Sequence, residues 1–206
     1  MNLVILGAGS FAREVYHHLA DSKNNYTVSF YDDTPDSMDT IFGSPVIDNP
    51  KKLSKLSSDH KFIVGVGNPD TKQSLVKIAL KSGIKPAPTY VHEKSLVQDA
   101  EIGLGGVVCP NTVITTNVKV GDYVTLNLGV TIGHDSVIGE YTNVSPGTNI
   151  SGNCIIGNKC DLGTNSSIIP NLKIADSTII GAGACLTKTI TESGVYVGIP
   201  AKKIGS

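Results

Sequence analysis

The feature that most constrains this chain is a six-residue period in its second half. Every sixth residue from Leu96 to Leu186 is Leu, Ile or Val, sixteen positions in succession, and residues 102–186 contain no slip in this register. The residues four places further on are mostly small, and Cys154 and Cys160 belong to that series. Six residues allow one short strand and a corner, so three units close an 18-residue coil that adds about 4.8 Å of height. The sequence therefore predicts a parallel β-helix over about 96–190, with its periodic aliphatic side chains pointing inward.

The first ninety residues follow a different pattern. The apolar run Asn2–Leu6 leads into two glycines, and apolar residues then recur at helical spacing over 11–19. Strand-like runs follow at Thr27–Tyr31 and 62–66, and a helix begins after Asn68. Alternating strands and helices favour a parallel sheet with flanking helices. We therefore expect a Rossmann-like α/β domain at 1–90 and a β-helix domain at 91–206.

The turn after the first strand indicates nucleotide binding. Gly7, Gly9 and Ser10 stand between the strand and the helix in the pattern GxGxxA, where backbone amides can approach a phosphate. Asp32 and Asp33, at the end of the next strand, offer acceptors for a ribose or a base edge. The alternatives are a tight turn that binds nothing and a solvated acidic pair.

Composition excludes several classes of function. Seventeen basic and eighteen acidic residues give a net charge of −1, which argues against a nucleic-acid partner. No apolar run is long enough for a membrane span, and no signal peptide is indicated. The four cysteines form no CxxC pair, so we expect reduced thiols, a cytoplasmic protein and no metal.

One histidine, His134, lies inside the unbroken repeat. It occupies the third place of its six-residue unit, as Pro110, Pro146 and Pro170 do in theirs, which predicts an outward-facing corner. A neutral imidazole there can accept a proton from an attacking amine or hydroxyl, and a carboxylate beside it can fix its tautomer. Asp135 is the candidate, although adjacent side chains in a strand diverge.

The periodic segment resembles the left-handed parallel β-helix acyltransferases. The whole chain resembles the bacterial nucleotide-sugar N-acetyltransferases and the related sialic acid O-acetyltransferases. The motifs that carry the likeness are Leu6-Gly7-Ala8-Gly9, Tyr31-Asp32-Asp33, Gly65-Val66-Gly67-Asn68, Asn127-Leu128-Gly129, Ile132-Gly133-His134-Asp135, Ser145-Pro146-Gly147 and Gly198-Ile199-Pro200-Ala201-Lys202.

This resemblance implies an activity and a set of roles. It implies a homotrimer that transfers an acetyl group from acetyl-CoA to a nucleotide-linked 4-amino-6-deoxy sugar in surface glycan biosynthesis, with the catalytic base at His134 and its partner at Asp135. The acceptor is expected at Gly7, Gly9, Ser10, Asp32, Asp33, Gly67, Asn68 and Asn127. Acetyl-CoA is expected at Asn143, Gly163, Gly181, Gly198, Pro200 and Lys202. Two positions depart from the family pattern: Asn143 stands where many relatives have a second His, and Lys72 stands where Arg is common.

Four other functions remain open at this point. An oxidoreductase would use the glycine turn but leaves the β-helix unexplained. A β-helical carbonic anhydrase needs three histidines on zinc, and the repeat has one. A non-catalytic sugar-nucleotide scaffold would lack a base, and an O-acetyltransferase would use a sialic acid hydroxyl. The sequence does not distinguish UDP, dTDP and GDP as the carrier.

Overall fold

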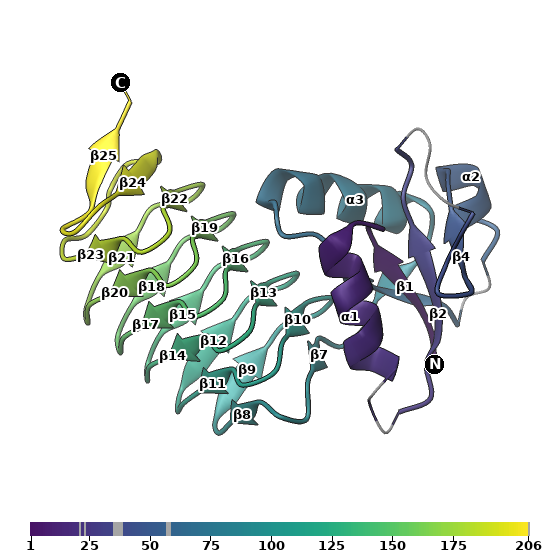
Figure 1. Ribbon diagram of the computed structural model, residues 1–206, viewed down its shortest axis with the longest axis horizontal. Coiled ribbons are helices and arrows are strands. Elements are labelled where there is room, and N and C mark those ends of the chain that lie inside the picture. The colour runs from purple at the N-terminus through teal and green to yellow at the C-terminus, as the bar shows by residue number, and fades with distance from the viewer. Residues whose placement is uncertain (21, 23, 35–38, 57–58, 206) are drawn as a thin grey trace.

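The computed structural model describes residues 1–20, 22, 24–34, 39–56 and 59–205. A layered α/β sheet occupies one end of the molecule and a triangular prism of short strands the other (Figure 1). The C-terminus lies at the end of the prism furthest from the sheet. None of the helices in the described ranges has the length and apolar character needed to cross a bilayer.

The first sheet buries both of its faces. Its strand order is β3-β4-β2-β1-β5-β6, and β1 pairs in parallel with β2 and β5. Along β1, Leu3 and Ile5 pack in the cluster that contains the apolar side of α1, while Val4 and Leu6 pack in the cluster that contains α3. The elements are β1 Asn2–Leu6, α1 Ser10–Ala20, β2 Thr27–Tyr31, β3 Thr40–Ile41, β4 Ser44–Ile47, α2 Pro50–Leu53, β5 Lys61–Val64, α3 Pro69–Lys81 and β6 Lys85–Pro86.

The predicted strand at 62–66 is shorter than expected, because β5 ends at Val64. Gly65 leaves the strand where the backbone passes α1 closely, and a Cβ on it would lie 2.9 Å from the Cβ of Ala12. The helix after Asn68 is confirmed as α3. The Asn68 side chain accepts a hydrogen bond from the Thr71 amide at 2.9 Å, and Gly83 follows the helix with φ of 84°.

The prism has three walls of parallel strands. Successive strands in a wall pair 18 residues apart, as Val108 does with Leu126 and Leu126 with Val144. The strands are β7 Tyr90–Val91, β8 Leu96–Val97, β9 Ala100–Ile102, β10 Val107–Val108, β11 Val113–Ile114, β12 Val118–Val120, β13 Thr125–Leu126, β14 Thr131–Ile132, β15 Val137–Ile138, β16 Asn143–Val144, β17 Asn149–Ile150, β18 Ile155–Ile156, β19 Asp161–Leu162, β20 Ser167–Ile168, β21 Lys173–Ile174, β22 Ile179–Ile180 and β23 Cys185–Leu186, followed by β24 Val195–Val197 and β25 Lys202–Ile204.

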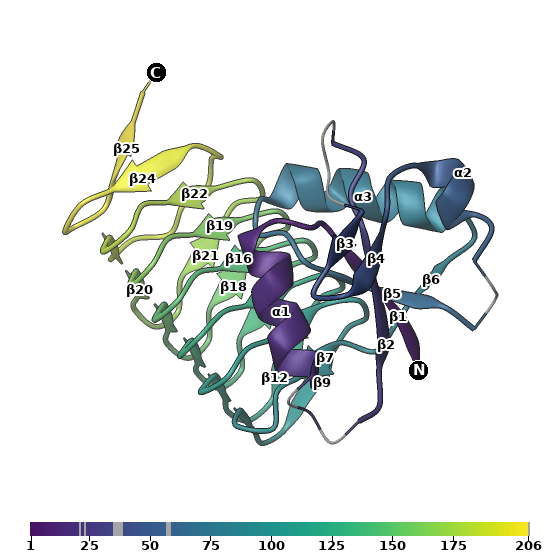
Figure 2. The ribbon, with the colours of Figure 1, turned by 45° about the vertical axis from the view of Figure 1, so that its right-hand side comes forward.

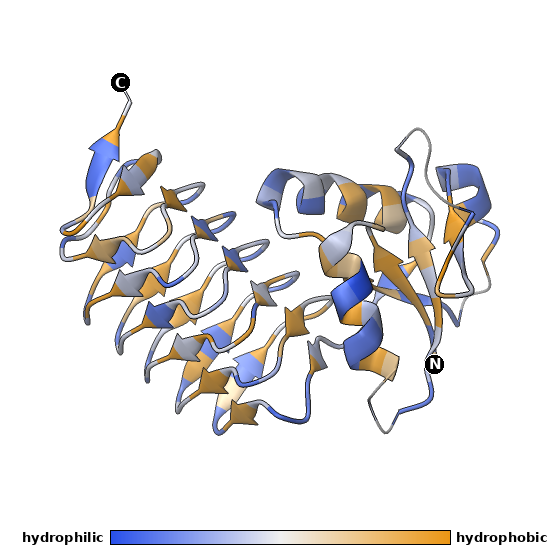
Figure 3. Ribbon diagram, viewed as in Figure 1, coloured by the Kyte–Doolittle hydropathy of each residue, from blue (hydrophilic) through white to orange (hydrophobic). Residues whose placement is uncertain are grey.

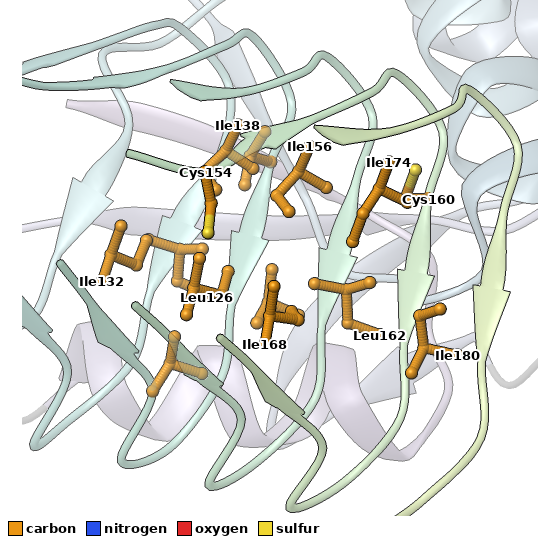
Figure 4. Packing of buried hydrophobic residues seen from close by; sticks show 14 of the residues in the cluster. Leu126, Ile132, Ile138, Cys154, Ile156, Cys160, Leu162, Ile168, Ile174 and Ile180 are labelled. Atoms are coloured by element: carbon orange, nitrogen blue, oxygen red, sulfur yellow. The ribbon is translucent and has the colours of Figure 1, made fainter. Parts of the chain in front are cut away.

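The inward register is confirmed from residue 108 to residue 186. Every periodic aliphatic side chain in that span is buried (Figure 4), and Cys154 and Cys160 fill the small positions beside them. The prediction is wrong at Leu96, which is 54% exposed. Val97 pairs with Ile114 instead, since the first coil is one residue shorter than the later ones. Figure 3 shows apolar residues on β1 and along the strands of the prism.

The N-terminal sheet packs against the prism wall that contains β7, β10, β13, β16 and β19. The ring of Phe62 stacks on Tyr123 with centroids 6.0 Å apart, and Tyr123 stacks on Tyr141 at 4.9 Å. The Tyr90 hydroxyl donates to the carbonyl of His18 in α1 at 2.6 Å. These contacts hold β5 and the end of α1 against the prism (Figure 2).

Candidate active site

His134 projects from the corner between β14 and β15, and its side chain is 57% exposed. Because His134 and Asp135 lie in a corner and not in a strand, the corner backbone determines how their side chains are oriented. Asp135 has a φ of 58°, in the left-handed region, so the two adjacent side chains converge instead of diverging. The Nδ1 atom of His134 lies 2.7 Å from Oδ2 of Asp135.

Neighbouring coils support this pair from both sides. Asn117, one coil earlier, donates from Nδ2 to Oδ1 of Asp135 at 2.6 Å. This bond, followed by the contact with His134, lowers the pKa of the Asp135 carboxyl. One coil later, Gly152 makes room for the imidazole, because a Cβ there would lie 2.6 Å from His134 Nε2. Sequence reasoning missed Asn117, although the 18-residue column Asn117, Asp135, Asn153 and Asn171 was a signal for left-handed corners.

The arrangement suits proton transfer at Nε2. An ionised carboxylate accepts a hydrogen bond, so Asp135 favours the tautomer of His134 with a proton on Nδ1. In that tautomer Nε2 holds a lone pair that can accept a proton. The carboxylate also stabilises the imidazolium that forms.

The glycine turn lies at the carboxyl ends of β1 and β2. Gly7 has a φ of 107° and donates from its amide to the Tyr31 carbonyl at 2.8 Å. The Ala8 amide donates to Oδ2 of Asp32 at 3.0 Å, while the amide and hydroxyl of Thr34 donate to Oδ1. The Asp32 carboxylate thus holds the turn in place. It already accepts the hydrogen bond of the Ala8 amide, one of the amides that we expected to bind a phosphate. The amides of Gly9 and Ser10 begin α1 at an exposed position.

Asp33 has a different environment from Asp32. It is exposed, and one of its oxygens accepts a hydrogen bond from the Tyr31 hydroxyl at 3.0 Å. Burial raises the pKa of Tyr31, and Asp33 raises it further, so the phenol stays protonated and remains a donor. Asp33 is therefore the member of the acidic pair that can meet a ligand.

Gly67 and Asn68 lie where α3 meets the prism. A Cβ on Gly67 would lie 3.4 Å from Oδ1 of Asn143, and Asn143 Nδ2 donates to Oδ1 of Asp161 at 2.8 Å. The structure therefore groups Asn143, expected at acetyl-CoA, with expected acceptor residues. Asn127 occupies the corner between β13 and β14, where its Oδ1 accepts from the Leu128 amide at 2.7 Å. One strand, β14, separates that corner from the corner of His134.

Lys72 lies at the seam, the region where α3 meets the prism. The sequence did not reveal its role there. Its side chain is fully buried, and Nζ donates to Thr125 Oγ1 at 3.1 Å and to the Thr142 carbonyl at 3.2 Å. Burial lowers the pKa of the ammonium to about 7, and Asp161 partly offsets this shift. The sequence did contain a signal for the burial of Lys72: it stands at helical spacing from Leu75, Val76 and Ala79, which form the buried face of α3.

The residues expected at acetyl-CoA lie mostly at the C-terminal end of the prism. Gly163 donates to the Ile180 carbonyl, Gly181 to the Tyr196 carbonyl, and Gly198 accepts from the Cys185 amide. Pro200 and Lys202 follow in the strand connection and in β25. Gly181 is three coils beyond Asn127, roughly 14 Å along the axis at about 4.8 Å per coil. A ligand that reaches both this end and His134 must be extended.

Comparison with known proteins supports the architecture. Residues 2–79 match the PglD N-terminal domain family. A GDP-perosamine N-acetyltransferase of Escherichia coli O157:H7 is 30% identical over 142 residues, which cover 66% of this chain and 63% of that protein. The chain thus spans less than two thirds of the length of that curated relative.

Two solved structures align over nearly the whole chain. The acetyltransferase domain of PglB from Neisseria gonorrhoeae FA1090, solved with acetyl coenzyme A, is 27% identical with a TM-score of 0.87, covering 98% of each chain. WeeI from Acinetobacter baumannii AYE is 28% identical with a TM-score of 0.87, covering 99% of this chain and 100% of that one. These comparisons confirm the resemblance indicated by the motifs: in sequence and in fold, the chain is related to the hexapeptide-repeat nucleotide-sugar N-acetyltransferases, with a PglD-type N-terminal domain.

Proposed function

We propose that this protein transfers the acetyl group of acetyl-CoA to the amino group of a nucleotide-linked 4-amino-6-deoxy sugar, in surface glycan biosynthesis. The observation that carries the proposal is the exposed His134–Asp135 pair on a corner of the prism. Two relatives support the substrates by their names: one is a GDP-perosamine N-acetyltransferase, and the PglB domain was solved with acetyl coenzyme A. The amino sugar is favoured over a sialic acid hydroxyl because the curated relative is an N-acetyltransferase.

The reaction requires one proton acceptor. The neutral amine attacks the thioester carbonyl, a C–N bond forms, and Nε2 of His134 takes the amine proton. The C–S bond then breaks, and the imidazolium can return the proton to the leaving thiolate of CoA. Asp135 keeps the ring oriented and balances its charge during the step. We expect this chemistry to need no metal.

The acceptor nucleotide fits best at the carboxyl edge of the first sheet. Gly9 and Ser10 are exposed residues at the start of α1, and Asp33 offers an exposed carboxylate after the neighbouring strand β2. Gly67, which has no side chain, lies close to Asn143 and leaves the backbone there open to a ligand. This edge faces ligands in many open parallel sheets.

Assembly as a homotrimer follows from the family likeness and from one wall of the prism. Val137 and Ile155 are paired neighbours on the wall that begins at the His134 corner, and both expose more than a third of their surface. Packing these walls around a threefold axis would bury them and bring a neighbouring subunit to His134. Light scattering should give three times the chain mass of 21.6 kDa, and a monomer mass at micromolar concentration would contradict this. Free cysteines and these substrates suit the cytoplasm.

The function is tested by following CoA thiol release from acetyl-CoA with a panel of acceptors. The panel contains GDP-perosamine, UDP- and dTDP-linked 4-amino-6-deoxy sugars, and a sialic acid. We expect turnover with one class of amino sugar and an N-acetylated product in the mass spectrum. Turnover with the sialic acid alone would replace N-acetylation by O-acetylation. If the nucleotide sugars bind but no thiol is released, the protein is a scaffold.

A further inference from the structure

Three side chains that can ligate a metal meet where the two domains touch. Glu14 and His18 lie one turn apart on α1, and Cys109 directly follows β10 in the prism. One carboxylate oxygen, one ring nitrogen and the sulfur all lie within 4.8 Å of one another. Cys109 is fully buried, and the Tyr90 hydroxyl fixes the end of α1 here through the His18 carbonyl.

Two of these atoms are buried without a hydrogen bond. Within the described ranges, Glu14 Oε1 and His18 Nε2 have no hydrogen-bond partner, although they lie 3.4 Å apart. Buried polar atoms without a partner are costly and uncommon in folded proteins. A protonated His18 would make this contact an ion pair, but that leaves the adjacent thiol without a role. A cation between the three groups would satisfy all of them.

The charge of the site also fits a divalent cation. Burial raises the pKa of the Cys109 thiol to about 12, and the Glu14 carboxylate contributes to the rise. Without a cation the thiol therefore stays protonated beside a carboxylate. A divalent ion with one thiolate, one carboxylate and a neutral imidazole would form a set with no net charge.

We propose that Glu14, His18 and Cys109 bind one divalent transition-metal ion of the zinc type, which ties α1 to the prism. Sulfur, nitrogen and oxygen donors together suit zinc, and tetrahedral bonds of about 2.0–2.3 Å place neighbouring donors roughly 3.4 Å apart. Glu14 Oε1 and His18 Nε2 already lie at this separation, 3.4 Å apart, so only the Cys109 sulfur needs to move closer. Water completes the coordination. The Glu14 side chain is 40% exposed and provides the entry path.

Binding of the metal ion releases one proton from the site. The metal replaces the thiol proton of Cys109, which goes to solvent, while Glu14 binds as the carboxylate and His18 as the neutral ring. Affinity therefore increases with pH. Sequence spacing gave no sign of this site, because Cys109 joins the two α1 residues only in the folded chain. The ion would be structural, on the wall facing the N-terminal domain and not at the His134 corner.

The test uses cobalt(II) as a spectroscopic probe on the reduced, chelator-treated protein. We expect one equivalent per chain to produce a thiolate-to-cobalt charge-transfer band, which an equivalent of zinc then abolishes by displacement. Cys109→Ser should lose the band. Glu14→Gln and His18→Gln should weaken binding roughly tenfold or more, since even outer-shell partners of metal sites contribute about that much. In the wild type, zinc should also raise the melting temperature.

Two matched controls keep the result specific. His17→Gln changes the exposed neighbour of His18 on the same helix, and Cys185→Ser removes a partly exposed thiol elsewhere, so both should keep the full band. If Cys109→Ser fails to fold by circular dichroism, the two α1 variants decide the outcome. A wild type without a saturable band overturns the proposal. So does a band that survives in folded Cys109→Ser, or one that both α1 variants leave unchanged.

Discussion

The two regions of this molecule encode their structure in different ways. In the prism, each strand pairs with strands 18 residues away, so a residue's environment follows from its place in the period. In the first sheet, β1 pairs with β2 and with β5, whose residues lie about 25 and 60 positions further on. A regular period makes exceptions conspicuous, which is why His134 stands out. The first sheet has no repeating pattern against which an exception would show. Its functional edge, at the carboxyl ends of β1 and β2, is formed by contacts between segments that are distant in the sequence.

The largest expected effect tests the inward register of the prism. Leu162 is fully buried, whereas Ile179, on the next strand of the same wall, is 45% exposed. Leu162→Ala should lower the free energy of unfolding by about 2–5 kcal/mol, because it leaves a cavity in the core. Ile179→Ala should change it by about 0.5 kcal/mol or less. Urea denaturation curves compare them, and equal losses would refute the register.

A second prediction concerns the seam, where one lysine joins the two regions. The pKa of Lys72 is about 7 in the folded chain and near 10.5 when unfolded, so between these values the unfolded state binds the extra proton. The stability of the wild type should therefore rise relative to Lys72→Met as pH increases from 7 to 10. Below pH 7 the folded chain holds a buried ammonium, and the difference should level off.

Melting temperatures across this pH range measure the effect. Asp161→Asn should lower the pKa of Lys72 further and shift the rise to lower pH, because Asp161 is the charge that favours the ammonium. Parallel pH profiles for the wild type and Lys72→Met would show that Lys72 does not titrate in this range.

A third, smaller effect separates the two aspartates of the first sheet. Asp33→Ala should raise KM for the acceptor by about tenfold with less change in kcat, as expected for the loss of one charge-assisted hydrogen bond. Asp32→Ala should instead lower the melting temperature, since Asp32 accepts three hydrogen bonds that hold the turn. An unchanged KM in Asp33→Ala would make the acidic pair purely structural.

The smallest predicted effect is at the carboxylate beside the base. Asp135→Asn retains the imidazole and removes only a charge that orients it, so kcat should fall by less than in His134→Ala. Asn117→Ala should raise the pKa of Asp135 towards its ordinary value, because the Asn117 hydrogen bond is the largest cause of the lowering. A drop in kcat for Asp135→Asn equal to that of His134→Ala would require a larger role for the carboxylate.

The fold was predictable to the extent that local patterns determine it. The period placed fourteen of the sixteen aliphatic positions in the buried core, and a fifteenth, Ile102, is partly buried and packs against it. The error at Leu96 arose because a coil can lose one residue without breaking the pattern. Strand, turn and helix at the N-terminus followed from the glycine turn and the cap at Asn68. The division near residue 90 stays a prediction, although strands up to β6 pair in the first sheet and strands from β7 pair in the prism.

The site was less predictable, because its contacts cross between coils and domains. The sequence indicated His134 and Asp135, but whether they touch depends on the φ of Asp135, and the support from Asn117 and Gly152 comes from neighbouring coils. Asn143 lies at the seam beside Gly67, a placement that requires the docking of the two domains. The roles assigned to these residues stay predictions.

The central claim is that His134 is the base of an acetyl transfer, and kcat of His134→Ala tests it most directly. With the acceptor identified by thiol release, kcat should fall by roughly 10²-fold to 10⁴-fold, while KM for acetyl-CoA changes much less. Residual turnover is expected, because positioning of two bound substrates supplies part of the rate. His17→Ala, an exposed histidine on α1, should retain full activity. An undiminished kcat in folded His134→Ala would contradict the account.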